Sequence, residues 1–306
     1  MNHTLLWPEI TVLQRGWLSA NNYLFQGPEG AALVDTGYCA HAAQTVALVQ
    51  QALGDLPLHR ILNTHLHSDH CGGNAALQAA YPQVQTWIAP GHAAHVRDWN
   101  PQALGYIPTG QQCPPFRADA LLQPGTTTVL GGRPWQIIAS PGHDPHSIIL
   151  FEPEKRILIS ADALWENGFG VIFEEIDGGH AFADAAATLD LIASLHPTVV
   201  LPGHGALFTD VDAALERARS KLAGYRADPH THARYAAKVL LKYKLLEQQR
   251  MPITEVQAWL QATPYLHTLH ARYADQQNLH DWMHDLIASL VRSGVAQMQG
   301  DVLVNQ

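Results

Sequence analysis

Three histidines and one aspartate lie within six consecutive residues, directly after an apolar run. His65 and His67 are two positions apart, so an extended segment lets their rings converge, whereas a helix would aim them at different faces. Asp69 and His70 can turn toward a second point if a helix begins near Gly72. The spacing therefore suggests two adjacent metal ions rather than one.

The competing interpretation of this cluster is a solvated histidine-rich loop, because histidine is abundant in the chain (19 of 306 residues). Gly72 and Gly73 favour the metal site, since residues without Cβ let backbone approach a crowded centre. Cys71, between the cluster and these glycines, is interpreted as a small buried side chain.

Residues 64–73 resemble the Thr-His-x-His-x-Asp-His-x-Gly-Gly signature of the metallo-β-lactamase-fold hydrolase superfamily. Four further segments resemble other motifs of that family in the right order: residues 33–37, 140–143, 160–163 and 202–205. The resemblance covers roughly residues 10 to 210 and points to the glyoxalase II and lactamase-β-2-like branch.

The resemblance implies two sets of metal ligands joined by one bridging carboxylate: His65, His67 and His143 for the first ion, Asp69, His70 and His204 for the second, and Asp162 between them. All seven residues are also expected to be catalytic. Imidazole and carboxylate donors suit Zn²⁺ first and Fe or Mn as alternatives, so two divalent transition-metal ions are the expected cofactors. Asp162 stands where one subgroup of true β-lactamases has a cysteine, which argues against that subgroup.

Two cations a few ångströms apart lower the pKa of a bridging water toward neutrality and polarise a carbonyl or phosphoryl oxygen. Hydrolysis then needs no serine or cysteine nucleophile, and Asp69 is a candidate for orienting the hydroxide. We therefore expect a binuclear metal-dependent hydrolase that uses a metal-bridging hydroxide on a small ester, thioester or lactone.

Other activities remain open. A glyoxalase-II-like glutathione thioesterase is one, although no basic cluster is visible for that anion. A ribonuclease is disfavoured by the acidic catalytic part. A mononuclear iron enzyme of the persulfide dioxygenase type shares much of the motif. A flavodiiron-like redox protein resembles this site except that it has a glutamate where His67 stands, and a metal-storage role is the weakest alternative.

Composition indicates a globular protein, with 47% hydrophobic and 15% charged residues. Three cysteines, Cys39, Cys71 and Cys113, do not suit a disulfide framework. No signal peptide is visible, and no apolar run reaches the ~18 residues of a membrane span. A cytoplasmic location without membrane association is expected.

The net charge of −9 is uneven along the chain, because residues 230–306 carry seven Lys and Arg against six Asp and Glu. Neither part has the basic surface that phosphate contacts require, so a small-molecule substrate is expected rather than nucleic acid. A homodimer is left open.

Apolar runs and helical periodicity alternate along the first 228 residues, which is typical of a layered domain of helices and sheets. Strands are expected at 10–14, 22–36, 60–63, 84–88, 126–130, 135–139, 147–151, 157–160 and 198–201, and helices at 41–53, 74–81, 180–196 and 210–226. With the resemblance, this pattern predicts an α+β protein with a four-layer αββα metallo-β-lactamase fold over residues 1–228.

Two irregular segments interrupt the alternation. Residues 99–124 are rich in proline and aromatic side chains and are expected to form one wall of the substrate pocket or a surface loop pinned by its own aromatics. Residues 164–179 are a candidate lid. His146 also departs from the family pattern, which commonly has glycine there, and this departure weakens any analogy of substrate.

Residues 229–306 are expected to form a small winged-helix-like domain similar to the tail of the lactamase-β-2-like branch. Helices are expected at 233–247, from a cap at Thr254, and at 280–292, followed by a hairpin over 294–304. The nearly balanced charge of this tail favours a packing or pocket-closing role over DNA binding.

Overall fold

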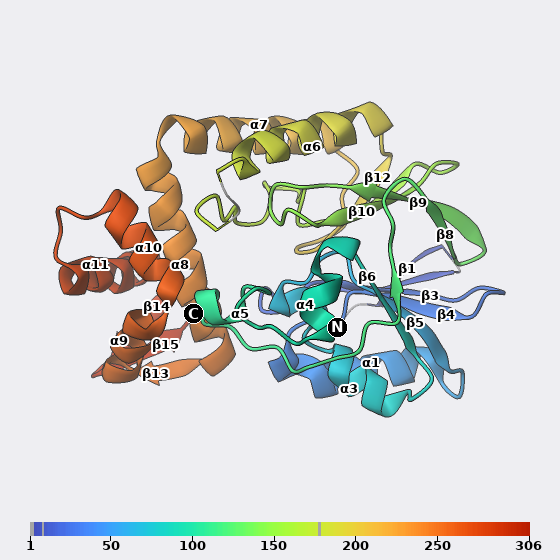
Figure 1. Cartoon of the computed structure of the whole chain (residues 1–306), viewed down its shortest axis with the longest axis horizontal. Helices are drawn as coiled ribbons and strands as arrows, with labels where there is room; N and C mark the ends of the chain where they lie inside the picture. Colours follow the sequence, from blue (N-terminus) through green and yellow to red (C-terminus); the bar gives the residue numbers. More distant parts are fainter. Residues whose placement is uncertain (1–2, 8, 177–178) are drawn as a thin grey trace.

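Two β-sheets pack face to face between two layers of helices (Figure 1). The computed structural model describes residues 3–7, 9–176 and 179–306. Helices α6 (Ala181–Leu195) and α7 (Val211–Ala227) cover one sheet, and α1 (Ala42–Leu53) and α3 (Asn74–Ala80) cover the other. This layering confirms the expected α+β class and the αββα arrangement.

The first sheet contains seven strands in chain order: β1 (His3–Trp7), β2 (Ile10–Leu13), β3 (Asn22–Phe25), β4 (Ala31–Val34), β5 (Leu58–Leu62), β6 (Gln85–Ile88) and β7 (Ala120–Leu121). Pairing is antiparallel from β1 to β4 and parallel from β4 to β7. The edge strands β1 and β7 were not predicted. β7 is too short to carry a periodic signal, and it forms only because its backbone pairs with β6.

The second sheet has the order β12-β11-β10-β9-β8 and consists of β8 (Thr127–Leu130), β9 (Arg133–Ala139), β10 (Ile148–Glu152), β11 (Ile157–Ala161) and β12 (Val199–Pro202). All five strands lie where the sequence predicts them. Strands β9, β11 and β12 run in the same direction, so their carboxyl ends lie at one edge of the sheet.

The core between the sheets is apolar. Trp135 of β9 is fully buried and meets Phe25 of β3 edge to face, with ring centroids 5.3 Å apart. The Tyr23 hydroxyl crosses from the first sheet to the second and donates to the Pro202 carbonyl at 2.6 Å. Burial raises the pKa of Tyr23, so the phenol keeps its proton and its bond. The two sheets are therefore joined at the end of β12.

A one-turn helix, α2 (Ser68–Cys71), corrects the expectation of a helix beginning near Gly72. The His67 backbone is extended (φ −64°, ψ 148°), and its carbonyl accepts the His70 N–H at 2.9 Å, which starts the turn four residues earlier. Asp69 and His70 thus lie on helical backbone, while His65 and His67 lie in the loop between β5 and α2.

The segment predicted to be irregular at 99–124 follows two short helices, η2 (Pro90–His92) and α4 (Ala93–Arg97), and contains a third, α5 (Tyr106–Thr109). Its aromatic side chains pack on one another, with Trp99 and Phe116 edge to face at 5.6 Å. The loop is therefore pinned by its own aromatics.

The tail has four helices and a three-stranded sheet: α8 (Pro229–Gln248), β13 (Arg250–Pro252), α9 (Ile253–Ala262), α10 (Pro264–Tyr273), α11 (Leu279–Arg292), β14 (Ala296–Gln299) and β15 (Val302–Asn305). The prediction of three helices and a hairpin missed β13 and α10. Strand β13 is only three residues long, and α10 is separated from α9 by Thr263 alone. Thr254 lies inside α9, whose N-cap is Pro252, so the predicted cap is wrong.

The division at residue 228 and the winged-helix comparison stay predictions. The tail has an apolar core of its own, to which Val171 and Phe173 of the preceding part also contribute. Within the described residues, no helix combines the length and apolarity needed to cross a bilayer.

Candidate metal centre

Four strands deliver the predicted ligands to one place. His65 and His67 follow β5, while His143, Asp162 and His204 follow β9, β11 and β12. Because those last three strands run in the same direction, their carboxyl ends meet at one edge, opposite the end of β5. Asp69 and His70 reach the same place from α2.

The first group of donors consists of three imidazoles. The His67 Nδ1 atom lies 3.2 Å from His65 Nε2 and 2.7 Å from His143 Nε2. Burial, with His143 as a second contribution, lowers the pKa of His67 to about 4, and burial lowers the pKa of His65 well below its ordinary value. Both shifts favour the neutral imidazole of His65 and His67, which is the form that binds a metal.

The second group consists of two carboxylates and two imidazoles. His204 Nε2 lies 3.0 Å from Asp69 Oδ2, and His70 Nε2 lies 3.3 Å from Asp162 Oδ1. Asp162 also faces the first group, because its Oδ2 atom is 3.3 Å from His143 Nε2 and 3.8 Å from His204 Nε2. One carboxylate therefore lies between the two groups.

The donor atoms fit two metal ions. In each group they lie within 4.8 Å of one another. His70 Nε2 is buried without a hydrogen-bond partner, and a buried polar atom of this kind needs a ligand. The structure thus brings all seven predicted residues together, and their role as metal ligands stays a prediction.

Asp35 holds one of these rings and was not assigned a role from the sequence. Its carboxylate accepts the Thr64 N–H at 2.9 Å and the Thr64 hydroxyl at 2.8 Å, and its Oδ2 atom lies 2.8 Å from His70 Nδ1. Burial alone would lower the pKa of His70, but Asp162, Asp35 and Asp69 outweigh it and raise that pKa well above its ordinary value. A hydrogen bond at Nδ1 directs Nε2 toward Asp162. Asp35 could have been found from the sequence, because it lies in the segment 33–37 that resembles a motif of the family.

His143 is positioned in a similar way, because its Nδ1 atom donates to the Val171 carbonyl at 2.5 Å. Backbone passes close to the ligands at two glycines. A Cβ at Gly170 would overlap the His143 ring, and a Cβ at Gly203 would overlap Asp162 Oδ1. Both positions therefore require glycine for space.

Gly72 and Gly73 are needed for a different reason from the one predicted. A Cβ on Gly72 would lie 2.5 Å from the Cys39 nitrogen, and one on Gly73 would overlap the Thr36 carbonyl. These two glycines therefore leave space for the backbone of the residues that follow Asp35, rather than for the ligand side chains.

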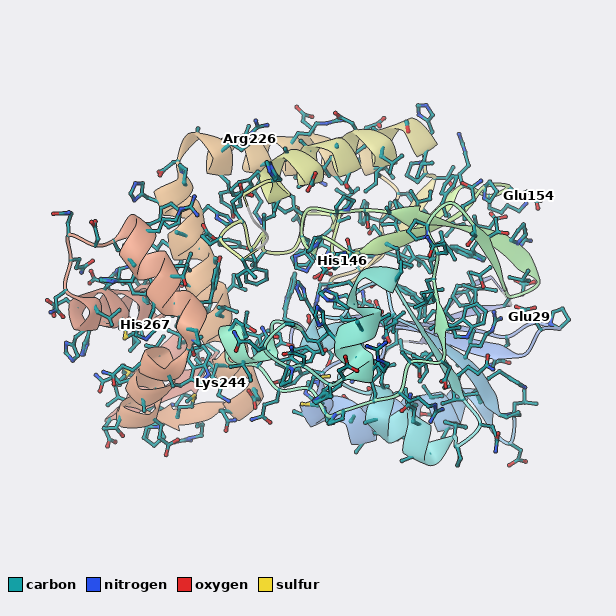
Figure 2. The ribbon with its side chains drawn as sticks, viewed as in Figure 1. Glu29, His146, Glu154, Arg226, Lys244 and His267 are labelled. Atoms are coloured by element: carbon teal, nitrogen blue, oxygen red, sulfur yellow. The ribbon has the colours of Figure 1, made fainter. Side chains whose placement is uncertain are left out.

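Asp144 is a second residue that sequence reasoning missed. Its Oδ2 atom lies 3.8 Å from His67 Nε2 and 3.6 Å from His92 Nε2. Burial opposes ionisation of this carboxyl, but the neighbouring imidazoles of His92 and His67 keep its pKa below the ordinary value. His146, which is labelled in Figure 2, donates its backbone N–H to Asp144 Oδ1 at 2.7 Å, and its ring packs edge to face on His92, with centroids 4.6 Å apart. Any residue except proline could donate this backbone bond, and His146 is not among the described residues that line the pocket, so the departure at position 146 adds no ligand.

A pocket opens above the donors, with about 160 Å³ accessible to the centres of water-sized spheres. The loop predicted as a wall does line it, through Leu104, Tyr106 and Gln111 among others, so the wall and pinned-loop interpretations both hold. Described residues of segment 164–179, from Trp165 to Ile176, also line the pocket. Residues 177 and 178 of this candidate lid lie outside the described residues, and its role as a lid stays a prediction.

Two tryptophans border the pocket beside His204. Trp17 stacks on the His204 ring at 5.5 Å, and Trp165 donates from Nε1 to Asp162 Oδ1 at 3.2 Å. Cys71, by contrast, is fully buried under the loop, 3.2 Å from the Tyr106 hydroxyl, which agrees with its interpretation as a small core side chain.

The sequence profile of the metallo-beta-lactamase superfamily matches residues 15–204. The chain belongs to this superfamily. Over 158 residues it is 35% identical to the hydroxyacylglutathione hydrolase of Stenotrophomonas maltophilia, a match that covers 51% of each chain. The chain therefore spans about half the length of that relative.

Two further proteins are similar over longer stretches. The acyl-coenzyme A thioesterase MBLAC2 of Gallus gallus is 24% identical over 209 residues, which are 62% of this chain and 73% of that one. The crystal structure of a metallo-beta-lactamase family protein from Thermus thermophilus aligns with a TM-score of 0.59 and 19% identity, covering 98% of this chain and 100% of the other. At that identity the likeness concerns the fold alone.

Proposed function

We propose that this chain is a binuclear metal-dependent hydrolase that cleaves a small ester, thioester or lactone. The observation that carries the proposal is the placement of Asp162 between two groups of metal donors at the floor of a pocket. The printed names of the curated relatives, a hydroxyacylglutathione hydrolase and an acyl-coenzyme A thioesterase, support the reaction class.

Two divalent ions in this centre, Zn²⁺ being the first choice for such donors, would supply an activated water and a Lewis acid for the substrate carbonyl. The protein holds the donors in place through Asp35, which fixes the His70 ring, and Asp144, which faces the outer nitrogen of His67. Such hydrogen bonds outside the ligand shell orient ligand rings and tune their basicity.

Asp69 has a second role in this proposal. Its carboxylate lines the pocket, and although burial opposes ionisation, the neighbouring His70 and His204 keep the pKa of Asp69 below its ordinary value. An ionised carboxylate at this point accepts a hydrogen bond from a water and orients it toward the substrate. Trp17 and Trp165 cover His204 and restrict access of bulk water from that side.

The partner we propose is a small molecule, and nucleic acid is disfavoured because no lysine or arginine is among the described residues that line the pocket. The test is metal analysis of the purified protein together with a panel of thioester, lactone and phosphodiester substrates. We expect close to two transition-metal ions per chain and turnover of thioesters or lactones. A reproducible single iron, with oxygen consumption on a persulfide, would instead assign the protein to the dioxygenase class.

A further inference from the structure

The pocket above the metal donors is apolar on three sides, and each side comes from a different part of the chain. The apolar side chains are Leu104 and Tyr106 from the 99–124 loop, Phe173 and Ile176 from segment 164–179, and Val239 and Leu240 from α8. The wall formed by α8 belongs to the tail, so the pocket is completed only when the tail is folded.

The described lining of the pocket contains acidic side chains but no lysine or arginine. Its carboxylates are Asp69, Asp144 and Asp162. Lys244, one residue after Tyr243 of the lining, is paired instead with Glu247 at 2.9 Å (Figure 2). An anionic group in the outer pocket would therefore be desolvated without a cationic partner.

Two large apolar side chains at this pocket are exposed to solvent. Trp17 is 58% exposed and Ile176 is 43% exposed. Exposed apolar groups that border a concave site usually mark the contact surface of a ligand. An apolar ligand would cover both side chains and remove their surface from water.

Resting on the proposed function, we propose that the substrate is an uncharged ester, thioester or lactone whose extended apolar acyl group lies against Val239 and Leu240 of α8. The carbonyl then sits over the metal donors, and the acyl chain extends toward the tail. A leaving group that carries carboxylates, such as glutathione, is disfavoured because the described lining of the outer pocket offers no lysine or arginine to pair with them. The tail thereby determines specificity.

Binding can be measured without turnover. Neutral methyl ketones from 2-butanone to 2-decanone are titrated into the purified protein, and the signal is its tryptophan fluorescence, to which Trp17 and Trp165 at the pocket contribute. Each added methylene should tighten binding about fourfold until the apolar wall is covered. Equal affinity along the series, or no binding of 2-decanone, would overturn the proposal whether or not the protein is a hydrolase.

Catalysis is then compared on one acyl group with two leaving groups. The octanoyl thioester of N-acetylcysteamine, which is neutral, should be cleaved at least about tenfold faster in kcat/KM than the octanoyl thioester of glutathione. Preference for the glutathione ester would overturn the specificity while leaving the hydrolase proposal intact. Failure to cleave any substrate of the panel would contradict the proposed function, and the ketone series would still decide the binding proposal.

A matched pair of variants locates the acyl chain. Val239→Phe fills the wall, whereas Leu246→Phe adds the same ring on the same helix at a half-buried position outside the pocket. Val239→Phe should weaken the binding of 2-decanone at least about tenfold and change the affinity for 2-butanone by less than about twofold. Equal effects of the two variants on the binding of 2-decanone would mean that the acyl chain lies elsewhere, and would overturn its assignment to α8.

Discussion

A single carboxylate joins the two halves of the candidate centre. Asp162 faces His70 through one oxygen and His143 and His204 through the other. Burial opposes ionisation of this carboxyl, but His70 and His204 beside it keep its pKa well below the ordinary value. Asp162 is also fixed from outside, because Trp165 donates to it at 3.2 Å. Its removal should therefore affect both ions at once.

We expect Asp162→Ala to deplete both metals and to lower kcat/KM roughly a thousandfold, because it removes a donor shared by both groups. His204→Ala should lower the metal content to about one ion per chain, since His204 belongs to the second group alone. The metal content of each variant is measured by elemental analysis. The control is His280→Ala, a substitution on the exposed face of α11. Two retained metals and near-normal turnover in Asp162→Ala would show that this residue does not bridge.

At the scale of elements, α8 connects the tail to the catalytic part. The Tyr243 hydroxyl donates to the Leu18 carbonyl at 3.0 Å, next to Trp17 at the pocket. Its ring packs edge to face on Tyr38, with centroids 5.3 Å apart. Burial raises the pKa of Tyr243 well above its ordinary value, so the phenol remains a donor at every working pH. The loop that carries Trp17 is thus held by a residue of the tail.

Tyr243→Phe removes this bond and leaves the Leu18 carbonyl without its donor. We expect a loss of about 1 kcal/mol of unfolding free energy, seen as a decrease in Tm of about 2 °C. Because Trp17 loses its support, KM should rise more than kcat falls. The control is Tyr225→Phe on α7, where the described residues offer the hydroxyl no hydrogen bond. The same change in KM in both variants would contradict the role of Tyr243.

At the scale of the whole molecule, the tail docks on the catalytic part at several points. Besides Tyr243, Trp259 donates to the Gly110 carbonyl at 3.3 Å, and Tyr265 donates to Glu175 at 2.6 Å. Phe173 enters the tail's apolar core while also lining the pocket. These contacts agree with a tail that packs and closes the pocket, and its lack of nucleic-acid binding stays a prediction.

Removal of residues 230–306 should leave the seven candidate ligands in place, because all of them precede this segment. It should cost solubility or substrate affinity, since the surface that α8 covers would be exposed to water. Metal content, light scattering and KM of the truncated protein provide the measurement. A truncated protein as soluble and active as the full chain would show that the tail is an independent module, and tight, salt-sensitive binding of the full chain to DNA or RNA would show that it is a nucleic-acid reader.

The sequence by itself determined the features whose signals are local. The cluster from His65 to His70 needs only six adjacent residues, and the strands before His143, Asp162 and His204 are short apolar runs, so both the site and its αββα frame could be predicted. The strands β7 and β13 were missed because two or three residues carry no periodic signal, and α10 was missed because a single residue separates it from α9.

Only the tertiary structure decided which distant residues support and surround the ligands. Asp35 lies 35 positions from His70, and Tyr243 lies 225 positions from Leu18, and no local pattern reports such pairings. The same holds for the pocket, whose described lining has no lysine or arginine and combines apolar side chains of the 99–124 loop and of segment 164–179 with those of α8. The sequence specifies the chemistry of each side chain, whereas the neighbours of that side chain depend on how sheets, loops and tail pack together, and that packing is set by long-range burial.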